Sequence, residues 1–119
     1  MERKYRFVAV DLDGTTLNNH HELTERTISQ FRALSSLGVT ICIATGRSLR
    51  AVLKILKILD LPQKEVPVVC YNGALAAICR KEDQEYQHAI QFHSPLETDH
   101  IKEILEFCSR RNCVVQVSV

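Results

Sequence analysis

Short apolar runs recur along the first part of the chain. Residues 7–10, 39–44 and 66–71 each form such a run, rich in β-branched residues and bounded by charged or turn-forming neighbours. Strands of a parallel sheet have this pattern when both of their faces are buried, because all of their side chains then meet apolar layers. The sequence therefore predicts three buried strands at these positions.

Two longer amphipathic segments lie between these runs. Apolar residues recur at helical spacing over residues 23–37 and 47–59. The first segment has Thr24 as a candidate N-cap and Gly38 as a C-terminal signal, and Pro62 stops the second segment. Both segments are predicted to be helices.

The order of these elements is strand, helix, strand, helix, strand. At these spacings the helices are right-handed crossovers between neighbouring parallel strands. The predicted class is α/β, with a Rossmann-like, three-layer arrangement in which helices cover both faces of an open parallel sheet.

The pattern changes after residue 73. Residues 74–79 and 86–92 are predicted to pair as a hairpin across the polar stretch between them. Residues 94–97 combine a capping-box spacing with a proline at the first helical position, so a helix that begins a new unit is expected there. Residues 113–119 are predicted to form a further strand. The apolar face of the predicted helix contains Ile101, Ile104, Leu105 and Cys108.

Composition narrows the class of protein. The chain has 119 residues, of which 45% are hydrophobic and 24% charged, and its formal net charge is +1. These values are typical of one soluble globular domain with a real core. Lys and Arg are scattered among nearly as many acidic residues, so the basic stripe of a nucleic-acid-binding protein is missing and we do not expect a nucleic-acid partner.

The cysteines and the N-terminus bear on location. Five cysteines contain no C-x-x-C pair, which favours neither a disulfide framework nor a zinc site and fits a reducing compartment. The apolar run near the N-terminus ends at Asp11, so it is too short for a signal peptide or a membrane span. We expect a cytoplasmic protein that does not bind a membrane.

A short polar motif follows each of the three predicted strands. These motifs are residues 11–15 (Asp-Leu-Asp-Gly-Thr), residues 45–47 (Thr-Gly-Arg) and residues 72–73 (Asn-Gly). Ligands of open parallel sheets bind beyond the carboxyl ends of the strands, so the three motifs should meet at one edge of the sheet.

These residue types suit phosphoryl transfer. The reaction needs a nucleophile, a proton donor for the leaving oxygen and positive charge to offset the phosphate. One of the two aspartates, Asp11 or Asp13, can attack phosphorus while the other exchanges a proton with the leaving oxygen and then with water. Mg²⁺ suits a site made of one or two carboxylates, a carbonyl and the substrate. Thr45 lies just ahead of a predicted helix, where free backbone N–H groups favour an anion.

The three motifs occur in the order Asp11-Leu12-Asp13-Gly14-Thr15, Thr45-Gly46-Arg47 and Asn72-Gly73. In this order they resemble the Cof-type branch of the haloacid dehalogenase superfamily, and the resemblance extends along the whole chain. The resemblance implies a Mg²⁺-dependent phosphatase in which Asp11 is the nucleophile and Asp13 is the general acid/base. It also implies that the Asp11 side chain and the Asp13 backbone carbonyl bind Mg²⁺, and that Thr45 binds phosphate. Asn72 and Gly73 are then expected near the substrate, a small phosphorylated metabolite. The full set of candidate substrate-binding residues is Gly14, Thr15, Thr45, Gly46, Arg47, Asn72 and Gly73.

The resemblance also divides the chain. Residues 1–73 correspond to the N-terminal part of the core domain, and residues 74–119 to the hairpin and the start of an α/β cap domain that shapes substrate choice. Family members continue to a phosphate-binding lysine and a late acidic motif of the Gly-Asp-x-x-x-Asp kind, which this sequence lacks. We therefore expect a fragment that is inactive by itself.

Several alternatives remain open. Asp-x-Asp-Gly can open a calcium loop, but the further acidic residues of that pattern are absent here. Arg47 could contact substrate or, equally, face solvent in the first turn of its helix. The five histidines are not spaced as the ligands of a metal site are, so we expect them on the surface or in loops. Cys42 and Cys70 are expected to be small core residues rather than nucleophiles.

Two classes of function follow. The first is a phosphatase, as part of a longer or assembled enzyme, with a phosphomutase of the same superfamily as a lesser alternative. The second is a non-catalytic remnant that keeps the fold and binds phosphate or a partner. Family members place the first strand in mid-sheet, so its free edge here should cause self-association or require the missing C-terminal half.

Overall fold

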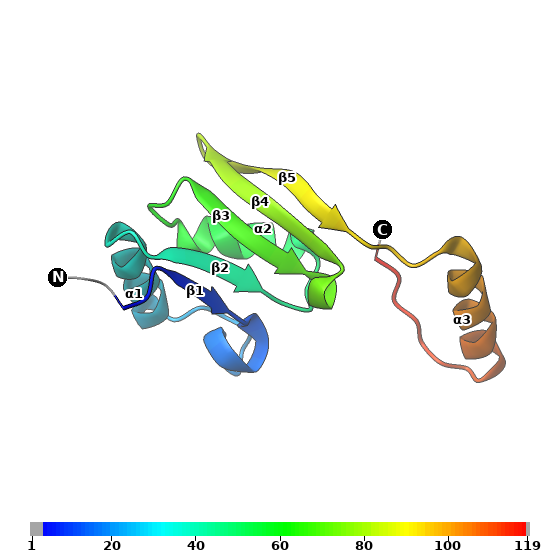
Figure 1. The fold of residues 1–119 in the computed structure, drawn as a ribbon. Coiled ribbons are helices and arrows are strands. Elements are labelled where there is room, and N and C mark those ends of the chain that lie inside the picture. Colours follow the sequence, from blue (N-terminus) through cyan, green and yellow to red (C-terminus); the bar gives the residue numbers. More distant parts are fainter. Residues whose placement is uncertain (1–3, 119) are drawn as a thin grey trace.

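A computed structural model describes residues 4–118, which contain a five-stranded sheet (Figure 1). Its strands are β1 (Phe7–Val10), β2 (Thr40–Ala44), β3 (Glu65–Cys70), β4 (Leu75–Glu82) and β5 (Glu85–His93). They lie in sequence order, with β1, β2 and β3 parallel and with β4 and β5 antiparallel to their neighbours. The α/β class is confirmed, and the sheet is mixed rather than purely parallel.

Side-chain caps set where the first two helices begin. The helices are α1 (Glu25–Ser36), α2 (Leu49–Leu59) and α3 (Thr98–Arg110). The Thr24 hydroxyl accepts a hydrogen bond from the amide of Thr27, which confirms the predicted N-cap of α1. The Ser48 hydroxyl accepts one from the amide of Ala51, so α2 begins two residues later than predicted. Arg47 is thereby left outside the helix.

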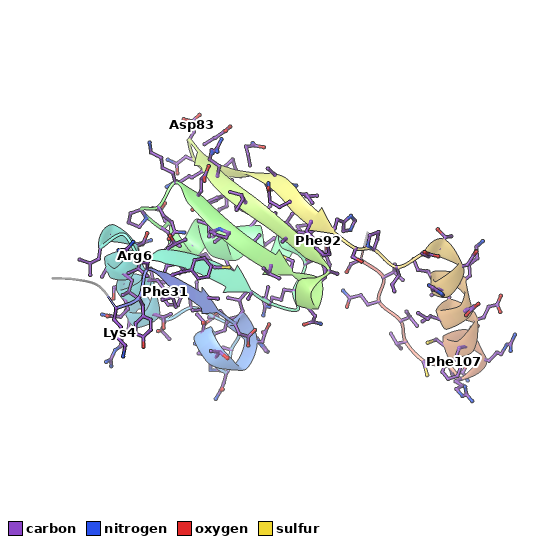
Figure 2. The ribbon with its side chains drawn as sticks, in the orientation of Figure 1. Lys4, Arg6, Phe31, Asp83, Phe92 and Phe107 are labelled. Atoms are coloured by element: carbon purple, nitrogen blue, oxygen red, sulfur yellow. The ribbon has the colours of Figure 1, made fainter. Side chains whose placement is uncertain are left out.

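The main core lies between the sheet and two helices. α1 and α2 lie side by side on one face, behind the sheet in Figure 1. Ile41, Ile43, Val66 and Val68 point into this core and are almost fully buried. Among residues 4–118 no helix covers the opposite face, so the expected third layer is not present there. Figure 2 shows Phe92 of β5 on this sheet, with 54% of its surface exposed.

The hairpin is longer than the sequence predicts. β4 runs to Glu82 and β5 starts at Glu85, leaving a two-residue turn in which Asp83 has a φ of 54°. The additional strand residues are mostly charged, so the pattern of hydrophobic residues did not predict them. Their side chains make ion pairs that the sequence does not reveal: Lys57 with Glu85 at 2.6 Å, Arg80 with Glu65, and Lys81 with Asp60.

Two predictions about the C-terminal part are wrong. The helix does not start at Ser94; the amide of Ser94 donates to the carbonyl of Ala74 at 2.8 Å, which continues the pairing of the hairpin by one residue. α3 begins at Thr98, after an N-cap at Glu97. Residues 113–118 have no regular structure, because no strand in the described part of the chain pairs with them, and Val119 lies outside the described residues.

Candidate active site

The three polar motifs follow β1, β2 and β3 at the same edge of the sheet. Since these strands are parallel and adjacent, their carboxyl ends coincide, as the sequence predicts. Hydrogen bonds link the motifs to one another. This edge is the candidate active site.

The first motif is a tight loop anchored by a buried leucine. Leu12 is fully buried, and its carbonyl accepts a hydrogen bond of 2.9 Å from the amide of Leu17. Gly14 has a φ of 76°, a conformation that strains residues with a Cβ. The turn leaves the Asp11 carboxylate exposed, where Oδ2 accepts a hydrogen bond of 3.2 Å from the Thr15 hydroxyl. Asp11 is therefore accessible to a ligand from solvent.

Arg47 holds the carboxylate of Asp13. Its Nε donates to Oδ2 and its Nη2 donates to Oδ1, each at 2.7 Å. This two-point geometry is the strongest form of an arginine–carboxylate contact. The Arg47 side chain thus points into the site, where its partner is the Asp13 carboxylate.

A third donor reaches the same carboxylate. His21 Nδ1 lies 3.2 Å from Asp13 Oδ1. The hydrogen bonds from Arg47 are the main cause of a lowered pKa at Asp13. They outweigh the opposing effect of desolvation and, with a weaker contribution from His21, lower this pKa from its ordinary value of 3.8 to about 2. Asp13 is therefore ionised at neutral pH. All five histidines are exposed, as predicted, but the contact of His21 was not foreseen.

The second and third motifs are joined through their backbones. The amide of Tyr71 donates to the carbonyl of Arg47 at 3.0 Å, and that of Asn72 donates to the carbonyl of Thr45 at 3.2 Å. The Thr45 side chain is buried, and its hydroxyl accepts a hydrogen bond of 3.1 Å from the amide of Arg47. These contacts fix the spacing of the two loops.

Gly46 lies directly against the Asn72 side chain. A Cβ added at Gly46 would lie 2.8 Å from Asn72 Oδ1, closer than real Cβ contacts come. Tyr71 and Asn72 themselves have φ values of 51° and 55°, an uncommon conformation for residues other than glycine. Gly73, with a φ of 99°, completes this turn. The glycine between Thr45 and Arg47 thus lets the Asn72 amide approach the edge.

The oxygen atoms at this edge of the sheet can supply some, but not all, of the ligands of a Mg²⁺ ion. In the described part of the chain no group of three or more His, Cys, Asp or Glu side chains could hold a metal. Mg²⁺ commonly needs only one or two carboxylates, together with waters and substrate oxygens. The exposed Asp11 carboxylate is available for this, whereas that of Asp13 is occupied by Arg47 and His21. The backbone carbonyl of Asp13 is then the candidate second ligand.

The buried thiols are not nucleophiles. Burial raises the pKa of Cys70 to about 11 and also raises the pKa of Cys42. Both residues are buried, as the sequence predicts, and stay protonated at neutral pH. They belong to the core rather than to the chemistry.

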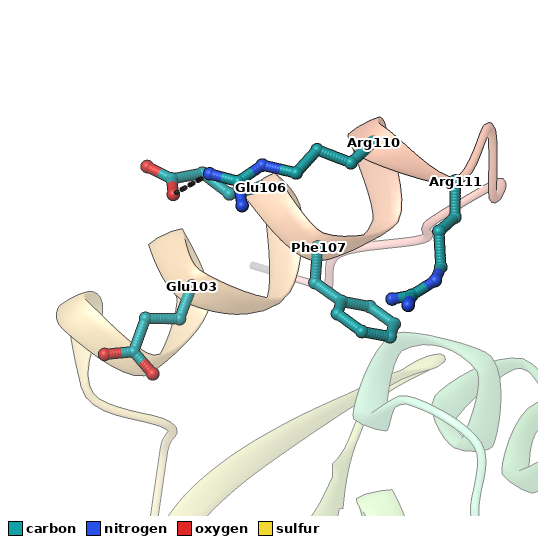
Figure 3. A pocket seen from close by; sticks show the side chains of 5 residues that line it. All are labelled: Glu103, Glu106, Phe107, Arg110 and Arg111. Carbon is teal, nitrogen blue, oxygen red and sulfur yellow. Dashed lines mark ion pairs between the residues drawn. The ribbon is translucent and has the colours of Figure 1, made fainter.

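Hollows elsewhere carry no comparable chemistry. Figure 3 shows one of about 380 Å³ on α3, where the Arg111 guanidinium lies 4.1 Å from the centre of the Phe107 ring. Arg110 and Glu106 form an exposed ion pair of 3.7 Å beside it. A larger, mostly apolar hollow of about 940 Å³ lies between α2, the hairpin and α3, with Tyr71 in its wall. In the described part of the chain its lining contains no metal-ligating cluster.

Comparison with known proteins identifies the family of this chain. Residues 8–119 match the sequence model of the family of haloacid dehalogenase-like hydrolases. The chain therefore belongs to this family of phosphatases and related hydrolases. A solved haloacid dehalogenase-like hydrolase from B. subtilis superposes on 90% of this chain with a TM-score of 0.71 and 23% identity, which shows a shared fold.

Two curated relatives come from Bacillus subtilis. YxeH is 42% identical over 71 residues, which are 60% of this chain and 26% of YxeH. The protein named 5-amino-6-(5-phospho-D-ribitylamino)uracil phosphatase YitU is 29% identical over 112 residues, which are 94% of this chain and 38% of YitU. The chain thus spans only about a quarter to two-fifths of the length of these relatives.

No helix among residues 4–118 has both the length and the apolar character needed to cross a membrane.

Proposed function

We propose that the chain supplies the nucleophile loop of a Mg²⁺-dependent phosphoric monoester hydrolase that works through an aspartyl-phosphate intermediate. One observation carries this proposal. An exposed carboxylate, Asp11, and a carboxylate held by arginine, Asp13, follow the same strand and lie at the edge where Thr45 and Asn72 also meet. Family membership supports the same chemistry.

In the first step a carboxylate oxygen of Asp11 forms a bond to phosphorus, and the bond between phosphorus and the ester oxygen breaks. Asp13 gives a proton to the departing oxygen. Water then attacks phosphorus, Asp13 takes a proton from that water, and the bond to Asp11 breaks to release phosphate. The Thr45 hydroxyl and nearby backbone amides hold phosphoryl oxygens.

The contact between Arg47 and Asp13 adds a condition to this scheme. A pKa of about 2 leaves Asp13 without a proton to give at neutral pH. Phosphate oxygens that approach Arg47 compete for its donors and bring negative charge close to Asp13. Both effects raise the pKa of a carboxyl group. Substrate binding thus prepares Asp13 for proton transfer.

Mg²⁺ would be held by the Asp11 carboxylate and the Asp13 backbone carbonyl, and when bound it offsets the negative charge of the phosphate. The remaining ligands and a phosphate-binding lysine would come from segments that this chain does not contain. We propose residues 1–73 as part of the core domain and residues 74–119 as the beginning of a cap that selects a small phosphorylated metabolite.

The test uses the longer protein that contains this chain, with p-nitrophenyl phosphate and Mg²⁺. Asp11→Asn should lower turnover by at least about 10³-fold, because an amide is neutral and a poor nucleophile. Asp60→Asn is the matched control, since Asp60 pairs with Lys81 at the other end of α2. Turnover near that of the wild type in Asp11→Asn would remove Asp11 from the nucleophile role.

A further inference from the structure

The loop after the first motif is a closed turn. Asn18 Oδ1 accepts hydrogen bonds from the amides of His20 and Glu22 at 2.9 and 3.0 Å. In the backbone, the amide of Asn18 donates to the carbonyl of Glu22, and the amide of His21 donates to that of Asn18, both at 2.9 Å. One asparagine side chain therefore braces the whole turn.

This turn sets the direction of His21. The residue has a φ of 60°, which a residue with a Cβ adopts only where its surroundings hold it there. Its side chain is 71% exposed, so no packing explains the conformation. The imidazole instead lies against Asp13, eight residues earlier in the chain.

The two oxygens of Asp13 are not equivalent. Oδ1 receives Arg47 Nη2 at 2.7 Å and faces His21 Nδ1 at 3.2 Å, whereas Oδ2 receives only Arg47 Nε. A carboxylate offers about four acceptor positions, so this set occupies three of them. The position that stays open is on Oδ2.

We propose that His21, presented by the turn that Asn18 braces, is a positioning residue that acts with Arg47 to hold the Asp13 carboxylate with Oδ2 open to the substrate. Arg47 alone fixes the plane of the carboxylate but treats its two oxygens alike. The single contact of His21 with Oδ1 makes them different. The catalytic meaning of this arrangement rests on the proposed function, but the arrangement itself can be measured without a substrate.

The measurement is the hydrogen-exchange rate of the Arg47 Nε–H group, followed by ¹⁵N NMR on the longer protein without substrate. His21→Ala should speed this exchange by about 2- to 5-fold, the range expected for loss of an exposed polar contact. His20→Ala is the matched control, because no hydrogen bond joins the neighbouring His20 side chain to Asp13. Asp13→Ala gives the exchange rate of the Nε–H group when Arg47 has no carboxylate partner at residue 13.

Conservative variants separate positioning from folding. His21→Asn keeps a side-chain donor near the place of Nδ1 and should restore most of the protection. Asn18→Ala should match His21→Ala, whereas Asn18→Asp keeps the acceptor oxygen and should stay near the wild type. Thermal melts of the His20 and His21 variants should agree closely with that of the wild type, since both residues are exposed and outside the core.

Exchange in His21→Ala that equals the wild-type rate, or a His20→Ala effect of the same size, would overturn the proposal. In the longer protein, His21→Ala should lower kcat more than it changes KM. If Asp11→Asn leaves hydrolysis intact while the exchange results hold, the proposed function fails and the positioning of Asp13 stands.

Discussion

At the scale of single residues, the candidate site depends on a contact between two side chains that lie far apart in the chain, those of Arg47 and Asp13. Asp11, Asp13, Thr45 and Asn72 could be placed because each follows a recognisable apolar strand. The contact of Arg47 with Asp13 joins residues 34 positions apart and depends on the register between β1 and β2. Local patterns carry no information about such a contact. The only sequence signal for His21 was its position in a polar turn.

Gly46→Ala should displace the Asn72 side chain, because its Cβ would lie 2.8 Å from Asn72 Oδ1. Since Asn72 is exposed and its side chain can rotate, the loss of stability should be at the low end of overpacking, about 1 kcal/mol. Urea denaturation measures the loss, and the Asn72 side-chain amide resonance should move. Gly14→Ala is the contrast, since a Cβ there meets open space and only the φ of 76° is strained. It should cost about 1–2 kcal/mol and leave the Asn72 resonance in place. A Gly46→Ala variant with unchanged stability would contradict this account.

The pKa of Asp13 predicts a pH dependence. Because this pKa is lower in the folded chain than its ordinary value of 3.8, ionised Asp13 contributes stability above about pH 4, and this contribution is lost as the pH falls towards 2. In Arg47→Ala the pKa should rise towards 3.8, and this loss should shrink. NMR titration of the Asp13 carboxyl carbon measures both values. An unchanged titration in Arg47→Ala would show that Arg47 is not the main cause.

At the scale of elements, N-cap signals were correct at Thr24 and wrong at Ser94. Both residues precede good helical patterns, but Ser94 continues the pairing of the hairpin through its bond to Ala74, and α3 begins only after Glu97. The strand predicted from residue 113 onward is absent over residues 113–118 for a different reason. A strand forms only with a neighbour, and hydrophobic patterning cannot show whether one is present.

Thr24→Ala should therefore cost about 1 kcal/mol of stability, since it removes the hydroxyl that accepts from Thr27 at the start of α1. Ser94→Ala is the matched control and should change stability by less than about 0.5 kcal/mol. Urea denaturation of the two variants tests the assignment. Equal losses in both would mean that Ser94 also stabilises a helix terminus.

At the scale of the whole molecule, the sheet has a free edge at β1 and a face without helices among the described residues. Phe7 is 54% exposed there. Such an edge is a template for pairing with another chain. We expect the isolated 119-residue chain to form dimers or larger assemblies in light scattering, and Ala9→Lys on β1 to reduce them. Gln30→Lys on the exposed surface of α1 is the control. A monomer with a sharp cooperative melt would contradict this expectation.

The isolated chain should also show no appreciable Mg²⁺-dependent hydrolysis of p-nitrophenyl phosphate. The loss of one cationic contact to the phosphoryl group typically costs about 10²–10³ in rate, and weak Mg²⁺ binding adds to this loss. The comparison is between the purified chain and its Asp11→Asn variant. Turnover that depends on both Mg²⁺ and Asp11 would show that a second copy or an unrecognised residue completes the site.

Backbone groups join the second motif to the third. This has a consequence for how the amino acids of the two loops can change during evolution. The bonds from Tyr71 to Arg47 and from Asn72 to Thr45 use amides and carbonyls that every residue except proline supplies. Side chains on these loops can therefore be exchanged during evolution while the loops keep their spacing. Gly46 and Gly73 are exceptions, because a Cβ at Gly46 would meet the Asn72 side chain and Gly73 has a φ of 99°. Single substitutions on these loops could thus change the substrate preference while the backbone of the edge stays in place.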